Sequence, residues 1–378
     1  MKSVGLFTCF LDNCGACLQA YALQNSIKDM GYSCEIIKFT EPYGYQRLYV
    51  NRYFRLKYLA LSSIKSLLKF DFTRRRFIYD DRRIAFDDFR NKNLLFSEKE
   101  YTTFSSLIVI PLKYDGYVCG SDQIWNPLFY KHNNPAYFLE AAPPKKKRIA
   151  YAPSIGLSKL PDEYSSEFKK LISKFDHLSV RELEGKNIIK NIANIDCRVV
   201  LDPTMLYDSD KWDKLAKSVK LKKPFIFCYI FGNQNFSWEF VDYIKNKTGL
   251  EVVCMPFFDE DFSRRYKMIS KCGPSEFLWL IKNAKLVLTD SFHATVFSII
   301  FETPFYTMLR NSDNEKLNMN SRIFNILSNL GLENRLISEK DAYTKEIDCV
   351  VDFTLPKEKL EKLRIESKEY LRNALGSV

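Results

Sequence analysis

Residues 285–301, KLVLTDSFHATVFSIIF, join an apolar strand to an apolar helix in a single short step. The run KLVLT predicts a buried strand, and Asp290 or Ser291 can cap a helix over residues 292–301. His293 then falls in the first turn of that helix. A strand that leads directly into a helix is the repeating unit of doubly wound α/β domains, which bind ligands beyond the carboxyl ends of their strands.

The same alternation extends outward and predicts a doubly wound domain over residues 222–355. Its other strands are expected at residues 224–230, 251–255 and 304–309, and its other helices at residues 236–247 and 274–283. The charged residues 357–375 predict a closing helix, which we treat as a separate segment, 356–378.

A first Rossmann-like domain is expected over residues 1–205. Residues 4–7, 16–30 and 34–39 have the patterns of strand, helix and strand, which form a βαβ unit of a parallel sheet. Later strands are expected at residues 116–119, 148–152, 177–180 and 199–201. Residues 43–105, rich in tyrosine and arginine, interrupt this alternation and are interpreted as a helical insertion. The lysine-rich residues 205–222 mark the boundary between the domains.

The composition suits two cytoplasmic domains. A chain of 378 residues with 46% hydrophobic residues can fill two cores. The start, MKSVGLFTCF, lacks the apolar stretch of a signal peptide, and no apolar run approaches the roughly 20 residues of a membrane span. The ten cysteines follow no regular framework, which is typical of reduced thiols. No second CxxC or histidine pair accompanies Cys14–Cys17, so we expect no metal site and no redox function.

The start of the helix at residue 292 is the strongest candidate site. Free N–H groups and the positive end of the helix dipole gather there and attract phosphate or carboxylate. His293 is one of only three histidines in the chain. The alternative is that Asp290 only caps the helix and that His293 is an ordinary surface residue.

A second candidate site is VCGSDQIWNP, residues 118–127, where a glycine and several polar residues follow a strand. A carboxylate and amides can bind sugar hydroxyls, while an indole covers the apolar face of a sugar ring. The alternative is a turn around a tryptophan of the core. The candidate binding residues are Ser121, Asp122, Gln123, Trp125 and Asn126.

Two further segments carry candidate binding residues. Arg181, in SVRE, can hold a carboxylate or phosphate with its planar fork, or it can form a surface pair with Glu182. Before the first helix, Asp12, Asn13 and Gly15 would allow the helix N-terminus to approach a ligand. The chain has neither GxGxxG nor GxxxxGK[ST], so we expect no dinucleotide cofactor and no P-loop.

The net charge of +11 is concentrated in one part of the chain. Between Arg47 and Lys92, 13 Lys and Arg residues accompany only 5 Asp and Glu residues. Segment 43–92 therefore suits an anionic surface, such as lipid head groups at the inner face of the cell membrane or a lipid-diphosphate substrate. A solvated charged face is the alternative. No nucleic-acid partner is expected.

Five blocks, DNCGACLQAYALQ, GSDQIWNP, SVRE, LDPTML and TDSFHATVFSIIFETPF, together resemble the polysaccharide pyruvyl transferase family. The resemblance covers residues 1 to about 335. It implies a GT-B-like fold, in which two Rossmann-like domains face each other across a cleft. It also implies transfer of a pyruvyl group from phosphoenolpyruvate, the co-substrate, to two hydroxyls of a sugar, which yields a pyruvate ketal and phosphate. The first domain would then bind the acceptor and the second the phosphoenolpyruvate.

By the same resemblance, Arg181 and residues 291–293 match positions for phosphoenolpyruvate binding and catalysis. Many relatives carry arginine and leucine where this chain has Ser291 and Phe292, so another cation would have to compensate. The candidates for that cation are Arg264, Arg265 and Arg322. We expect His293 to act as the acid, with Asp122 or Asp290 as the base.

The nearest alternative function is that of a GT-B nucleotide-sugar glycosyltransferase, because one fold serves both chemistries. The acceptor sugar, its linkage and its attachment to a polyprenyl diphosphate stay open, as does the oligomeric state. A catalytically silent polyanion-binding protein is a third class that the basic segment alone would allow.

Overall fold

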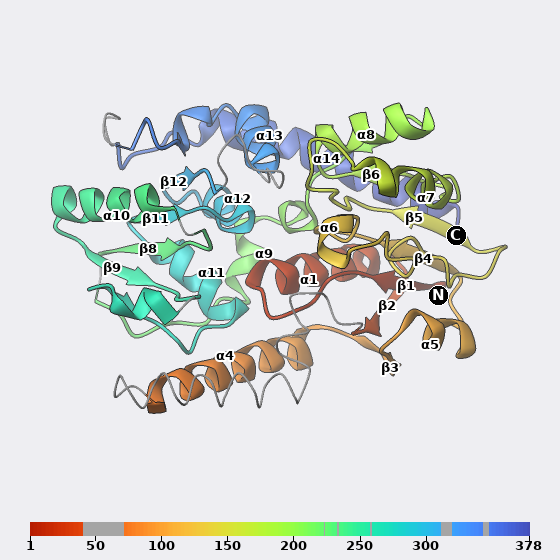
Figure 1. Ribbon diagram of the computed structural model, residues 1–378, viewed down its shortest axis with the longest axis horizontal. Helices are drawn as coiled ribbons and strands as arrows, with labels where there is room; N and C mark the ends of the chain where they lie inside the picture. The colour runs from red at the N-terminus through yellow and green to blue at the C-terminus, as the bar shows by residue number, and fades with distance from the viewer. Residues whose placement is uncertain (41–71, 223, 233, 258, 311–319, 343–347) are drawn as a thin grey trace.

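The computed structural model describes residues 1–40, 72–222, 224–232, 234–257, 259–310, 320–342 and 348–378. Two parallel sheets, each with helices on its faces, form two Rossmann-like domains that lie side by side (Figure 1). This arrangement confirms the predicted α/β class. No described helix is both long enough and apolar enough to cross a membrane.

The first domain is built on a five-stranded parallel sheet in the order β3-β2-β1-β4-β5. The central strands are apolar because parallel strands are covered on both faces, and Val4, Leu6 and Val118 are fully buried. The strands are β1 (Ser3–Phe7), β2 (Ser33–Phe39), β3 (Phe96–Tyr101), β4 (Gly116–Cys119) and β5 (Lys147–Ala150). The helices are α1 (Cys14–Asp29), α4 (Phe72–Asn93), α5 (Phe104–Val109), α6 (Pro127–Tyr130), α7 (Asp162–Ile172) and α8 (Leu183–Ala193).

A short parallel pair, β6 (Ser179–Val180) and β7 (Arg198–Val199), extends this domain. A bridge between Ile149 and His177 connects the pair to β5. The chain then passes through a 3-10 turn (Pro203–Leu206) and α9 (Ser209–Asp213) into the second domain.

The second domain has a six-stranded parallel sheet in the order β10-β9-β8-β11-β12-β13. Successive strands run outward in both directions from β8 and β11, so the switch point, where such sheets bind ligands, lies between these two strands. The strands are β8 (Phe225–Tyr229), β9 (Glu251–Cys254), β10 (Lys267–Met268), β11 (Leu286–Thr289), β12 (Phe305–Met308) and β13 (Leu336–Ile337). The helices are α10 (Asn235–Thr248), α11 (Pro274–Asn283), α12 (Phe292–Ile300) and α13 (Ser321–Leu330), with 3-10 turns at Asp259–Ser263 and Glu333–Arg335.

The last helix, α14 (Thr354–Gly376), returns from the second domain to the first (Figure 1). Its carboxyl-terminal half buries Leu371 and Leu375 in the apolar cluster that contains β1 and β2. The Tyr370 hydroxyl donates a hydrogen bond to the carbonyl oxygen of Ala150 over 3.0 Å. The helix therefore fixes the second domain to the first.

The two domains also share an apolar core beside the sheets. One buried cluster contains Leu18 of α1, Phe89 of α4, and Phe277 and Phe297 of α11 and α12. Trp212 of α9 packs edge-on against Phe297, with ring centroids 5.0 Å apart. The start of α12 is thus held against the first domain by close packing.

The interpretation of residues 43–105 as an insertion is wrong at its carboxyl-terminal end. Residues 96–101 form β3, which pairs with β2 at the edge of the first sheet. The sequence FSEKEY does not have the apolar pattern of a buried strand. It is an edge strand, and Glu98, Lys99 and Glu100 are exposed. Residues 41–71 lie outside the described residues, so the predicted membrane contact of segment 43–92 stays a prediction.

Candidate functional site

The candidate site lies where the two domains meet, and it combines segments that are far apart in the chain. The first domain contributes the turn after β4, the end of β6 and the segment after β7. The second domain contributes the first turns of α12 and α13. Beside them lies a pocket with about 540 Å³ of empty space, part of which is open to solvent, and it is lined by the end of β6, the segment after β7 and residues of α12, α13 and α14. The turn after β4 and His293 adjoin this pocket through their contacts with Asp202 and Arg181 but do not line it.

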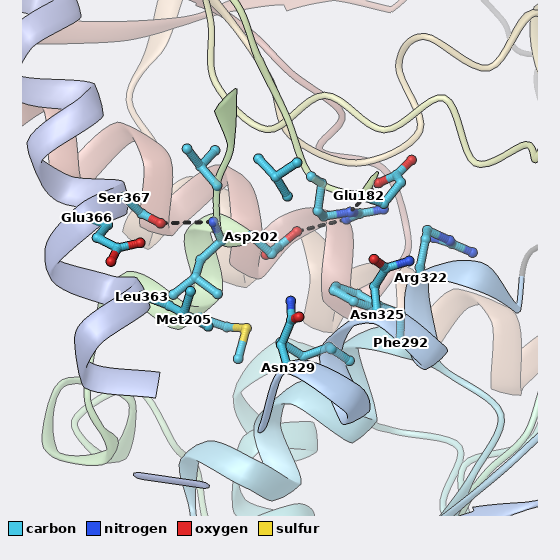
Figure 2. A pocket seen from close by; sticks show the side chains of 15 residues that line it. Glu182, Asp202, Met205, Phe292, Arg322, Asn325, Asn329, Leu363, Glu366 and Ser367 are labelled. Carbon is cyan, nitrogen blue, oxygen red and sulfur yellow. Dashed lines mark hydrogen bonds and ion pairs between the residues drawn. The ribbon is translucent and has the colours of Figure 1, made fainter. Parts of the chain in front are cut away.

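Figure 2 shows this pocket from close by. Phe292 of α12 lies beside Arg322 and Asn325 of α13, and Glu366 and Ser367 of α14 form the opposite wall. The remaining lining residues are Arg181, Glu182, Val199, Val200, Leu201, Asp202, Met205, Ile326, Asn329 and Leu363.

Asp202 is at the centre of the polar contacts. Its Oδ2 atom accepts a hydrogen bond from Nη1 of Arg181 over 2.8 Å and lies 3.1 Å from the Ser121 hydroxyl. Nε2 of His293 lies 3.6 Å from the same oxygen, so the two form an ion pair when the imidazole is protonated. The Oδ1 atom accepts bonds from the amide and hydroxyl of Thr204. One carboxylate therefore joins residues of both domains.

The surroundings of Asp202 keep it ionised. Burial alone would raise the pKa of this carboxyl group, because a charged form loses its hydration. The neighbouring imidazole of His293 and the guanidinium of Arg181 outweigh burial and hold the pKa far below its usual range. Asp202 is therefore a permanent negative charge between the two basic groups.

Arg181 is buried and surrounded by carboxylates. Its side chain is only 2% exposed, and Asp202, Glu182 and Asp122 lie 2.8, 3.7 and 3.8 Å from its nitrogen atoms. Its guanidinium carbon lies 4.6 Å from the centre of the Phe292 ring. The alternative of a surface Arg–Glu pair is therefore excluded.

His293 is more enclosed than a residue at the mouth of a cleft. The residue is 7% exposed, and its ring packs against Gly15 at the start of α1. A Cβ atom on Gly15 would lie 2.1 Å from Nδ1, so this position has no room for a side chain. The imidazole thus lies between the N-termini of α1 and α12, with Nε2 directed to Asp202.

Arg322 comes from α13 and also lies near Phe292, with its guanidinium carbon 5.9 Å from the ring centre. When the Gln123 amide is oriented to suit its neighbours, its oxygen accepts from both terminal nitrogens of Arg322, over 3.2 and 3.3 Å. Burial, and then the charge of Arg181, lower the pKa of Arg322 to about 10. Of the three cations expected to compensate for Ser291, Arg322 is the one beside the pocket, whereas Arg264 stacks on Trp238.

Buried polar atoms without hydrogen-bond partners gather at this junction. Among the described residues, they include Nε and Nη2 of Arg181, Oε2 of Glu182, Nε2 of His293 and Nε of Arg322. A buried polar atom that lacks a partner costs about 1 to 3 kcal/mol, so native proteins keep few of them. Four residues with such atoms lie together at this junction, which makes it the best candidate among the described residues for a site that binds a polar ligand.

The turn after β4 brings only some of the predicted sugar-binding residues to this site. Ser121 and Asp122 face Asp202 and Arg181, and Gln123 contacts Arg322. Gly120 has φ +136°, and a Cβ there would lie 1.8 Å from the Tyr151 carbonyl oxygen, so the tight turn requires glycine.

The predictions for Trp125 and Asn126 are wrong. Trp125 is 1% exposed, stacks on Phe138 with ring centroids 5.1 Å apart, and donates from Nε1 to the Tyr137 carbonyl oxygen. Asn126 is fully buried and caps α6 by accepting a hydrogen bond from the Leu128 amide. Both residues stabilise the first domain from within, because the strand-end turn folds back onto the core.

Asp290 and Ser291 have structural contacts. Ser291 is the N-cap of α12. The two carboxylate oxygens of Asp290 accept hydrogen bonds from the amides of Phe231 and Gly232 and from the Arg310 guanidinium. Asp290 therefore clamps the loop after β8, and this set of partners suits a structural anion better than a base.

Of the candidate binding residues at the start of α1, two have structural contacts and one contacts His293. Asn13 caps α1 by accepting a hydrogen bond from the Ala16 amide, and Asp12, which is half-exposed, pairs with Arg90 over 2.7 Å. Gly15 alone reaches the site, through the His293 ring. Burial raises the pKa of the Cys17 thiol to about 12, so this cysteine stays protonated and does not suit redox chemistry.

Sequence reasoning did not identify Asp202 and Glu182 as site residues. Glu182 is 1% exposed and accepts hydrogen bonds from the Ser154 hydroxyl and the Gly156 amide. The position of both acidic residues directly after short strands was the available signal. The described residues form no cluster of three or more His, Cys, Asp or Glu side chains that could hold a metal ion.

The fold and the site together define a GT-B-like protein of two Rossmann-like domains with a charged pocket at their junction. The sequence model of the polysaccharide pyruvyl transferase family matches residues 13–313, and the chain belongs to this family. No match is found among curated proteins.

The chain is similar to several solved structures of low sequence identity. S. aureus MnaA, solved with UDP, is 11% identical with a TM-score of 0.51, over 98% of this chain and 91% of that chain. UDP-GlcNAc 2-epimerase from Methanocaldococcus jannaschii is 15% identical with a TM-score of 0.49, over 96% and 92%. MurG from Acinetobacter baumannii is 7% identical with a TM-score of 0.45, over 100% of both chains.

Proposed function

We propose that this protein transfers a pyruvyl group from phosphoenolpyruvate to two hydroxyls of one sugar unit in a polysaccharide precursor. The family supports pyruvyl transfer in polysaccharide synthesis, and the chemistry of the pocket supports this donor. The observation that carries the proposal is the group of buried, incompletely bonded cations at the domain junction. A small dianion would supply the missing acceptors for Arg181 and Arg322.

The reaction balances without any cofactor. One sugar hydroxyl adds to C2 of the donor, and a proton is added to the methylene carbon, which becomes a methyl group. Phosphate then leaves as the C2–O bond breaks, and the second hydroxyl attacks C2 to close the ketal ring. One hydroxyl proton thus ends on the methyl group, and the other leaves with phosphate.

His293 is the proton donor in this proposal. Asp202 lies 3.6 Å from Nε2 and would form an ion pair with a protonated imidazole, and 9% of the His293 side chain is exposed. Asp122, which is 19% exposed, is the better candidate for the base, because the oxygens of Asp290 are occupied. Arg181 and Arg322 would stabilise the charge on the departing phosphate.

Isotopic label tests the donor. Phosphoenolpyruvate labelled in its carbon skeleton is incubated with the protein and a panel of simple and lipid-linked glycosides that carry neighbouring hydroxyl pairs. Label in the glycan, with one phosphate released per label transferred, supports the proposal. Transfer of sugar from a nucleotide sugar without incorporation of this label would replace it with the glycosyltransferase alternative.

His293→Ala tests the acid, and His132→Ala is the matched control, because His132 is exposed on the first domain. General acid catalysis contributes about 10² to 10⁴ in rate, so His293→Ala should lose that much. His132→Ala should keep the wild-type rate. A folded His293→Ala protein within threefold of wild type would remove His293 from the mechanism.

A further inference from the structure

The two arginines beside Phe292 differ in how their charges are compensated. Three carboxylates lie within 4 Å of Arg181. Within the described part of the chain, Arg322 forms no ion pair at that distance. Arg181 is therefore ion-paired in the free protein, whereas Arg322, which is only 8% exposed, has no carboxylate of the described residues within 4 Å and feels Glu182 and Asp122 only from farther away.

We propose that Arg322 is the residue that anchors an oxyanion of the donor in the pocket beneath Phe292. Arg181 adds N–H donors, and Arg322 adds a positive charge that no carboxylate of the described residues pairs within 4 Å. This inference rests on the proposed function, since it assigns the anchor of the same donor, but binding can be measured without turnover.

The position of Arg322 on α13 supports this role. It occupies the second residue of a ten-residue helix, where free N–H groups and the helix dipole already favour an anion. A cation at that position is unfavourable unless an anion is bound nearby. Nε of Arg322 and the hydroxyl of the preceding Ser321 are both buried, and neither has a hydrogen-bond partner among the described residues.

The pocket beside Arg322 has the features of a small-anion site. Both guanidinium groups lie near the Phe292 ring, with their carbons 4.6 and 5.9 Å from its centre. Asn325 and Asn329 follow on the pocket side of the same helix and line the pocket further in. Two guanidinium groups beside one ring, each with a buried N–H that has no hydrogen-bond partner among the described residues, would suit one oxyanion.

The substitution Arg322→Gln separates binding from stability. It removes a buried charge that has no carboxylate within 4 Å in the described part of the chain, so we expect the free variant to be at least as stable as wild type. The same change removes charge-assisted hydrogen bonds to the ligand, so phosphoenolpyruvate should bind about 10- to 100-fold more weakly. Arg322→Lys keeps the positive charge but loses the planar guanidinium fork, so its affinity for phosphoenolpyruvate should lie between those of wild type and Arg322→Gln.

Arg264→Gln is the matched control. Arg264 belongs to the same domain, lies 4.0 Å from the Trp238 ring centre, and also has a buried Nε without a hydrogen-bond partner among the described residues. It does not line the pocket. Calorimetric titration of Arg264→Gln with phosphoenolpyruvate should give the wild-type dissociation constant.

Titrations with inorganic phosphate and with pyruvate show which oxyanion Arg322 holds. The probe whose affinity falls with Arg322→Gln identifies that group as phosphate or carboxylate. The proposal is overturned if Arg322→Gln binds phosphoenolpyruvate within threefold of wild type, or if wild type binds none of the three probes. Loss of stability in both Arg322→Gln and Arg322→Lys would also overturn it, because Arg322 would then be a structural residue. Tight, Arg322-dependent binding without transfer to any glycoside would keep the anchor and reject the proposed function.

Discussion

The change Gly15→Ala would place a methyl group in the space that the His293 ring occupies. The added Cβ would lie 2.1, 2.3 and 2.7 Å from Nδ1, Cγ and Cε1 of the ring. Ordinary van der Waals contact begins at 3.4 Å, so the ring has to move by about 1.3 Å. Because Asp202 lies beyond Nε2, this movement alters the contact between the imidazole and that carboxylate.

Two magnitudes follow from this displacement. Extra methyl groups in a close-packed region cost about 1 to 3 kcal/mol, although alanine recovers up to about 1 kcal/mol through its higher helix propensity. The net loss of stability should therefore be small, at about 0 to 2 kcal/mol. Misplacing a catalytic group by about 1 Å can cost 10²-fold in rate, so the turnover number should fall by that order.

Urea unfolding and phosphate release from phosphoenolpyruvate measure the two effects separately. Gly185→Ala is the matched control, because this glycine also lies in the first turn of a helix that follows a strand. Its added Cβ would meet Val180 at an ordinary 3.5 Å, so both stability and rate should be preserved. A Gly15→Ala protein with the wild-type rate and stability would refute the packing of His293 on α1.

Three further changes test separate parts of the site. Asp202→Asn leaves Arg181 without its closest counter-ion, so the free energy of unfolding in urea should fall by about 3 kcal/mol at neutral pH. A loss under about 0.5 kcal/mol would show that the ion pair between Asp202 and Arg181 does not stabilise the fold. Because the pKa of Asp202 is depressed in the folded protein, its contribution to the free energy of unfolding is complete above the unfolded pKa of about 3.9. This contribution is lost as the pH falls below that value. The stability difference between wild type and Asp202→Asn should therefore shrink in urea titrations below about pH 4. If this stability difference grew as the pH fell, the pKa of Asp202 would be raised in the folded protein and not depressed. Trp125→Ala removes a core side chain and should lower the free energy of unfolding by about 3 to 5 kcal/mol. The KM for the acceptor should be unchanged in the folded variant. A raised KM without loss of stability would show instead that Trp125 binds the sugar.

The fold was predictable because its strands are short apolar runs and its helices begin at recognisable caps. Residues 285–301 became β11 and α12 with Ser291 as the cap. The strand β3 was not predictable by the same pattern, because half of an edge strand faces solvent and its sequence is charged. The return of α14 to the first domain also depends on contacts across the whole chain, which local periodicity does not encode.

The site was predictable where a residue lies within a few positions of a strand end, as Arg181, Asp122 and His293 do. The partners of these residues were harder to assign, because a carboxylate such as Asp202 acquires its role from groups on other segments. Trp125 shows the opposite difficulty, since the same local sequence suits a sugar platform and a core residue. Only the packing of the turn onto Phe138 distinguishes the two.

The position of phosphoenolpyruvate in a crystal of the complex tests the central claim most directly. We predict that its oxyanions lie within hydrogen-bond distance of Arg181 and Arg322, over the Phe292 ring, and that the His293 imidazole faces the donor. Electron density for the donor at another place, with these guanidinium groups still unbonded, would contradict the account.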